Sequence, residues 1–159
     1  PATTGADAVD AAIATAFALA VTLPSAGNIG GGGFMVYHGA DGTSTTFNFR
    51  EKAPQAASER MYLDANGQIK DNSNHEGPLS VGVPGTVAGL WMAHGKLGSK
   101  PWADLVKPSV ELAEKGFPST WDMQDILSYF QKQKQIQIQI RIDRTTSFAT
   151  QINAVMQMR

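Results

Sequence analysis

A run of four glycines, Gly30 to Gly33, follows a long apolar segment and constrains the fold more than any other feature of this chain. Only Thr15 and Thr22 are polar between residues 11 and 23, which predicts a core helix over residues 7–22. The glycine run places little steric restriction on φ. We therefore expect a loop whose backbone packs closely against a neighbouring segment or a substrate.

A β-hairpin is predicted directly after the glycine run. Residues 34–38 form the first expected strand, residues 39–42 a turn containing Asp-Gly, and residues 43–50 the returning strand. The two-residue period places Thr45, Phe47 and Phe49 on one face of the second strand, and Thr46, Asn48 and Arg50 on the other. The hairpin should therefore bury two phenylalanine rings and present an arginine at the strand end.

The remaining segments predict a loop followed by helices. Residues 52–74 are loop-rich, with a tight turn at Asn66-Gly67. Helices are expected over residues 86–96, as a pair over 102–115 interrupted at Pro108 and closed by Gly116, and over 121–132. Residues 135–142 alternate polar residues with isoleucine, which fits an edge strand or a non-native end. We thus expect one partial domain over residues 1–134 and a tail of unknown structure over 135–159.

Composition excludes several functional classes. Thirteen basic against fourteen acidic residues give a net charge of -1, which offers no electrostatic basis for binding nucleic acid or an anionic membrane. The absence of cysteine excludes disulfides, thiolate metal sites and a cysteine nucleophile. The apolar run is too short for a membrane span. His38, His75 and His94 lack metal-ligand spacing, and no serine-nucleophile motif or phosphate-binding loop is complete.

Arg50 is the residue best placed to bind a ligand, and two interpretations of it remain open. The first is a surface ion pair with Glu51, which would contribute about 0–1 kcal/mol. The second is a guanidinium that a rigid hairpin offers to a carboxylate in bidentate fashion, which a lysine could not copy. The residues by themselves favour the ion pair.

Six ordered segments resemble the large subunit of γ-glutamyltranspeptidases. They are Ala8–Ala12, Gly30–Met35, Arg50–Pro54, Met61–Asp64, Val81–Gly89 and Leu112–Pro118. Together they lie within about residues 5 to 130, and the tail over 131–159 shows no such resemblance. The resemblance implies an α/β fold, the αββα sandwich of N-terminal-nucleophile hydrolases, only partly represented by this chain.

The resemblance also implies an activity for the complete enzyme. A precursor cleaves itself into large and small subunits, and the N-terminal Thr of the small subunit attacks the γ-glutamyl amide of glutathione or a related compound. The acyl group then passes to water, an amino acid or a peptide, with no metal or organic cofactor. Export to the periplasm or the medium is expected from the same resemblance.

Within this chain, the resemblance assigns Arg50 to binding the substrate α-carboxylate and assigns no catalytic residue. Thr145-Thr146 precedes Ser147 where the family's processing motif has His, so neither Thr is assigned as the nucleophile. The chain by itself should be inactive, because the partner small subunit carries the nucleophile. The alternatives are a non-catalytic γ-glutamyl or amino-acid binding module and an inactive truncated product.

Overall fold

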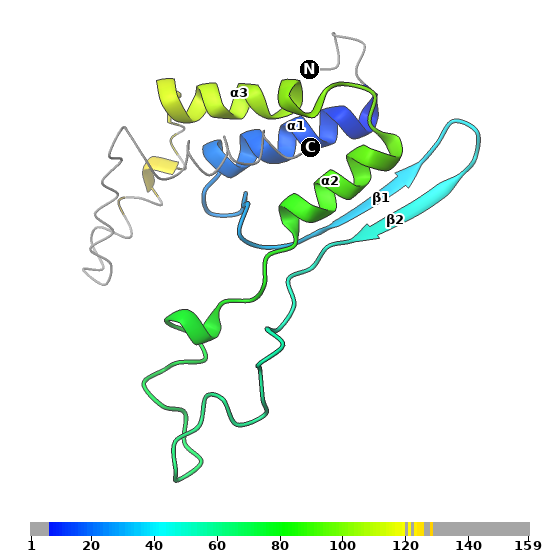
Figure 1. Ribbon diagram of the computed structural model, residues 1–159. Helices are drawn as coiled ribbons and strands as arrows, with labels where there is room; N and C mark the ends of the chain where they lie inside the picture. Colours follow the sequence, from blue (N-terminus) through cyan, green and yellow to red (C-terminus); the bar gives the residue numbers. More distant parts are fainter. Residues whose placement is uncertain (1–6, 120, 122, 126–127, 129–159) are drawn as a thin grey trace. The chain divides into compact units, whose positions relative to one another are not determined.

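The computed structural model describes residues 7–119, 121, 123–125 and 128 (Figure 1). Its elements are, in chain order, α1 (Ala8–Thr22), β1 (Phe34–His38), β2 (Ser44–Asn48), the 3₁₀ turn η2 (Pro78–Ser80), α2 (Thr86–Leu97) and α3 (Trp102–Lys115). The described residues divide into two compact units, one built from residues up to Asn28 and from Leu90 onward, the other from Ile29–Gly89. The mixture of helices and a hairpin agrees with the predicted α/β class.

In the first unit, α1 begins and ends close to where the sequence predicts. The Asp7 carboxylate accepts hydrogen bonds from the backbone N–H groups of Val9 and Asp10, both at 2.9 Å, and so caps the helix. The helix ends at Thr22, and its C-cap is Leu23, the residue before Pro24. Its buried residues Val9, Asp10, Ile13, Phe17 and Ala20 lie along one side. Helix α3 lies beside α1 and contacts it (Figure 1).

Helix α3 is one continuous helix, so the predicted interruption at Pro108 is wrong. Its buried residues recur at helical spacing as Trp102, Leu105, Val106, Ser109 and Val110. Pro108 lies on the exposed side and removes the N–H that would bond the Asp104 carbonyl. Packing of the apolar side keeps the helix intact across this missing bond. Gly116 ends the helix as predicted, at φ 78° with its N–H bonded to the Leu112 carbonyl at 3.0 Å.

Asp10 is fully buried in α1 and holds the connection between α2 and α3. Its carboxylate accepts hydrogen bonds from the Ser99 hydroxyl at 2.6 Å, the Ser99 N–H at 3.1 Å and the Lys100 N–H at 3.0 Å. A buried carboxylate is tolerated when several donors surround it. The first turn of α1 is thereby fastened to a loop about ninety residues away.

The second unit contains the predicted hairpin. β1 and β2 pair antiparallel from Phe34 opposite Asn48 to His38 opposite Ser44, and Gly42 has φ 81° in the turn. Phe47 is buried, whereas its strand neighbours Thr46 and Asn48 are exposed, which confirms the predicted faces. β2 is shorter than the predicted strand over 43–50, and Phe49 beyond it is only half-buried.

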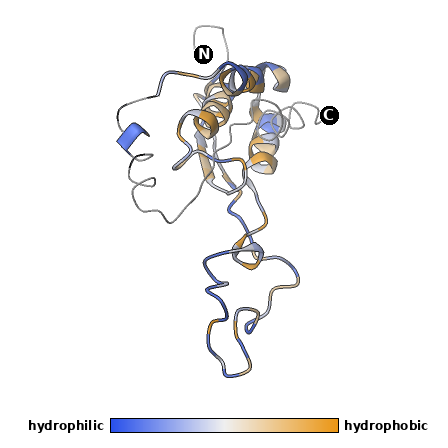
Figure 2. Cartoon of the chain, turned by 90° about the vertical axis from the view of Figure 1, so that its left-hand side faces the viewer, coloured by the Kyte–Doolittle hydropathy of each residue, from blue (hydrophilic) through white to orange (hydrophobic). Residues whose placement is uncertain are grey.

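A long loop connects the hairpin to α2. Gly67 has φ 77° and donates its N–H to the Asp64 carbonyl at 3.1 Å, which confirms the tight turn at Asn66-Gly67. The loop alternates short hydrophilic and hydrophobic stretches, whereas the long hydrophobic stretches lie on the helices (Figure 2). α2 matches the helix predicted over 86–96 to within one residue.

Several predictions fall beyond the described part of the chain. They are most of the helix over 121–132, the domain boundary at 134, the alternating segment over 135–142, and Thr145-Thr146. Among the described residues, no helix has both the length and the apolar character needed to cross a membrane.

Candidate functional site

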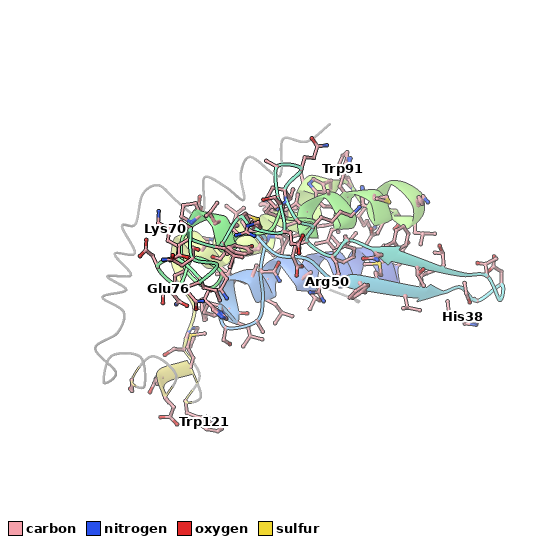
Figure 3. All side chains as sticks on the ribbon, turned by 90° about the horizontal axis from the view of Figure 1, so that it is seen from below. His38, Arg50, Lys70, Glu76, Trp91 and Trp121 are labelled. Carbon is pink, nitrogen blue, oxygen red and sulfur yellow. The ribbon has the colours of Figure 1, made fainter. Side chains whose placement is uncertain are left out.

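Arg50 lies just after β2, at the end of the hairpin opposite to the His38 end (Figure 3). Its backbone N–H donates to the Asn48 side-chain oxygen at 3.1 Å. Its guanidinium donates to Glu51 Oε1 from Nη2 at 2.9 Å and from Nε at 3.2 Å, and its side chain is 60% exposed. The ion pair that the sequence favoured is therefore present, in a position that solutes can reach.

The glycine run borders Arg50 on one side. Gly33 and Phe49 exchange two backbone hydrogen bonds of 3.0 and 3.4 Å, which continue the pairing of the hairpin. A Cβ on Gly32 would overlap the Glu51 backbone nitrogen and lie 2.7 Å from the Arg50 Cα. The close packing predicted for the glycine run is confirmed, and its reason is the approach of the Arg50-Glu51 backbone.

A second glycine-rich segment, before and within the start of α2, borders Arg50 on the other side. Lys52 and Val83 exchange backbone hydrogen bonds of 3.2 and 2.8 Å. A Cβ on Gly85 would overlap the Phe49 carbonyl, and one on Gly89 would overlap the Phe49 ring. Residues 49–52 are thus held between two segments whose glycines leave room for them.

The two glycine-rich segments are also joined to each other. The Gly31 carbonyl accepts the N–H groups of Gly85 at 2.7 Å and Thr86 at 3.1 Å. The sequence did not predict that the segments Gly30–Met35, Arg50–Pro54 and Val81–Gly89 meet at Arg50. It also did not predict the role of Gly82, Gly85 and Gly89 there. The available signal was the repeated glycine at residues 82, 85 and 89, which marks close backbone approach but not the partner.

The charges at Arg50 suit an anionic ligand. The backbone N–H of Glu51 itself, and then the Arg50 guanidinium, lower the pKa of the Glu51 carboxyl below its usual value, so Glu51 is ionised at neutral pH. Glu51 occupies the Nε and Nη2 edge, and Nη1 makes no hydrogen bond with the part of the chain described. A guanidinium with one edge occupied retains donors for a carboxylate.

The other candidate residues do not join this site. His38 Nδ1 lies 2.8 Å from the Ser44 hydroxyl near the hairpin turn, and His94 Nε2 donates to the Lys100 carbonyl at 2.7 Å. His75 is exposed on the loop between the hairpin and α2. Within the described ranges, no group of three or more His, Cys, Asp or Glu residues could hold a metal ion.

Solved structures define the class of protein to which this fold belongs. γ-Glutamyltranspeptidase from Helicobacter pylori is 44% identical with a TM-score of 0.76, over 80% of this chain and 37% of that chain. The enzyme from Pseudomonas nitroreducens complexed with L-DON is 44% identical with a TM-score of 0.72, over 82% and 40%. The chain is part of an αββα N-terminal-nucleophile hydrolase sandwich, as predicted.

The family follows from the sequence comparison. The family model described as gamma-glutamyltranspeptidase matches residues 3–154, which extends past the six segments into the tail, and the chain belongs to this family. Glutathione hydrolase proenzymes are similar over 113 residues, with 54% identity in Pseudomonas aeruginosa and 46% in Escherichia coli. Each match covers 71% of this chain, and the chain spans about a fifth of the length of these relatives, 20% in both cases.

Proposed function

We propose that this chain is part of the large subunit of a γ-glutamyltranspeptidase that acts on glutathione or related γ-glutamyl compounds. The observation that carries the proposal is Arg50, whose backbone is held by two family motifs and whose guanidinium is 60% exposed. Its remaining donors would bind the α-carboxylate of the glutamyl group. The names of the relatives, glutathione hydrolase proenzymes, support the substrate class.

Arg50 would contribute to the reaction by binding one end of the substrate, the α-carboxylate of the glutamyl group. With the α-carboxylate bound, the γ-carbonyl at the other end of the glutamyl group would be restricted to few positions, which lowers the entropic cost of the attack. The nucleophile would be the N-terminal Thr of a small subunit, with its own α-amine as the base. The γ-glutamyl-enzyme would pass the acyl group to water, an amino acid or a peptide.

The proposal includes the organisation of the enzyme. The chain would be inactive by itself, would contribute no catalytic residue, and would pair with the small subunit after self-cleavage of a common precursor. The word proenzyme in the relatives' names supports processing. Export to the periplasm or the medium belongs to the same proposal, and cell fractionation with a cytoplasmic marker enzyme tests it.

Replacing Arg50 in the complete enzyme tests the proposal. Arg50→Ala leaves the substrate carboxylate without its partner, and we expect a loss of about 2–5 kcal/mol in transition-state stabilisation, measured as kcat/KM for a γ-glutamyl anilide. Lys115→Ala is the matched control, because Lys115 forms an exposed ion pair with Glu111 at the same 2.9 Å distance. Equal kcat/KM for Arg50→Ala and the parent would contradict the proposal.

A further inference from the structure

The Glu51 side chain lies close to two glycines, Gly32 and Gly82. A Cβ on Gly32 would lie 2.5 Å from Glu51 Oε2, and a Cβ on Gly82 would lie 3.1 Å from its Cγ and 3.2 Å from its Cβ. A side chain at residue 32 would overlap the Glu51 backbone and displace the Glu51 carboxylate, and one at residue 82 would lie against the Glu51 Cβ and Cγ. Gly32 therefore makes room for the Arg50-Glu51 backbone and for the Glu51 carboxylate, and Gly82 makes room for the Cβ and Cγ of Glu51.

The Arg50–Glu51 pair, in which the Glu51 side chain is 36% exposed, has a geometry that the Glu111–Lys115 pair lacks. Glu51 Oε1 accepts from both Nε and Nη2 of the guanidinium, so it fixes the plane of the group as well as its position. In the Glu111–Lys115 pair, one ammonium contacts one oxygen at 2.9 Å across a helical turn. The Glu111–Lys115 pair has the same N–O distance as the Arg50–Glu51 pair, but it does not fix the orientation of its cation.

We propose that Glu51 is a positioning residue that orients Arg50 for the substrate α-carboxylate, with Gly32 and Gly82 leaving room for it. This inference rests on the proposed function of Arg50. Glu51 takes one edge of the guanidinium and leaves the donors at Nη1 for the ligand, so that the arginine is oriented before the substrate arrives. The opposite role would be competition, in which the Glu51 carboxylate occupies Arg50 and weakens binding.

A pair of substrates separates positioning from general structural damage. One is a γ-glutamyl anilide, and the other is the 4-aminobutanoyl anilide, which is the same compound without the α-carboxylate. In the complete enzyme, Glu51→Gln removes the charge at nearly constant size. We expect kcat/KM for the first substrate to fall roughly tenfold to a hundredfold and kcat/KM for the second to stay at the parent value. Glu111→Gln is the control, with no change on either substrate.

Each other outcome overturns the inference. A higher kcat/KM for the γ-glutamyl anilide would make Glu51 a competitor, an equal loss on both substrates would make it merely structural, and no change would remove its role. If Glu51→Gln does not fold, Glu51→Asp replaces it, because aspartate keeps the charge but its carboxylate lies one methylene closer to the backbone. The same selective loss on the γ-glutamyl anilide is expected. Arg50→Ala on the same two substrates tests the proposed function separately. If it shows the selective loss and the Glu51 variants do not, only this inference fails.

Discussion

At the residue scale, the buried carboxylate of Asp10 shows how one side chain can make stability depend on pH. Burial raises the pKa of Asp10, and the hydrogen bonds from Ser99 and Lys100, with a smaller contribution from His94, outweigh it, so the pKa lies below 3.8. The folded protein thus binds this proton less readily than the unfolded chain. The contribution of Asp10 to stability is complete above about pH 4 and is lost as the pH falls through the folded-state pKa.

Asp10→Asn should therefore destabilise the protein at neutral pH and have less effect in acid. The NH₂ group of the asparagine is itself a hydrogen-bond donor, so it cannot accept the hydrogen bonds that Ser99 and Lys100 donate to Asp10. We therefore expect a loss of about 1–3 kcal/mol in unfolding free energy. The measurement is urea unfolding at pH 7 and near pH 3. Asp71→Asn is the control, because its carboxylate is exposed on a loop. A difference from the parent that is equal at both pH values would show that Asp10 does not titrate as argued.

At the scale of elements, local sequence patterns predict structure well wherever neighbours in the chain make the decisive contacts. Helix α1 and the hairpin with its Asp-Gly turn are such cases, and each begins within one residue of where the sequence predicts. Pro108 marks the limit of the same reasoning. Its local penalty argues for a break, yet the contact of α3 with α1 decides the outcome, and that contact is not written in the local sequence.

Pro108→Ala tests this account of α3. The alanine N–H can bond the Asp104 carbonyl, and the gain should exceed the entropy that proline removes from the unfolded chain. We expect unfolding free energy to rise by about 1–3 kcal/mol, measured by urea unfolding against Glu114→Ala, an exposed residue of the same helix. Destabilisation by Pro108→Ala alone would mean that the proline ring contributes packing that outweighs the missing hydrogen bond.

For the whole molecule, the site could be predicted only in part. Arg50 at a strand end and the close-packed glycine run follow from periodicity and from the lack of side chains. The contact of Gly82 with Glu51 joins residues 31 positions apart, and no local rule supplies that pairing. The resemblance to a family named Arg50 as the ligand-binding residue, but the surroundings that give this arginine its orientation needed three-dimensional structure.

The proposed division into two subunits implies that the native enzyme contains a second polypeptide. In the proposed enzyme, this chain supplies Arg50 and a second polypeptide supplies the nucleophile. Intact mass spectrometry with N-terminal sequencing of the purified native protein should therefore find a second chain that begins with Thr, since self-cleavage creates that terminus and its α-amine acts as the base. A preparation in which no chain begins with Thr, and which shows no γ-glutamyl transfer, would contradict the two-subunit proposal and make Arg50 a binding residue without a reaction.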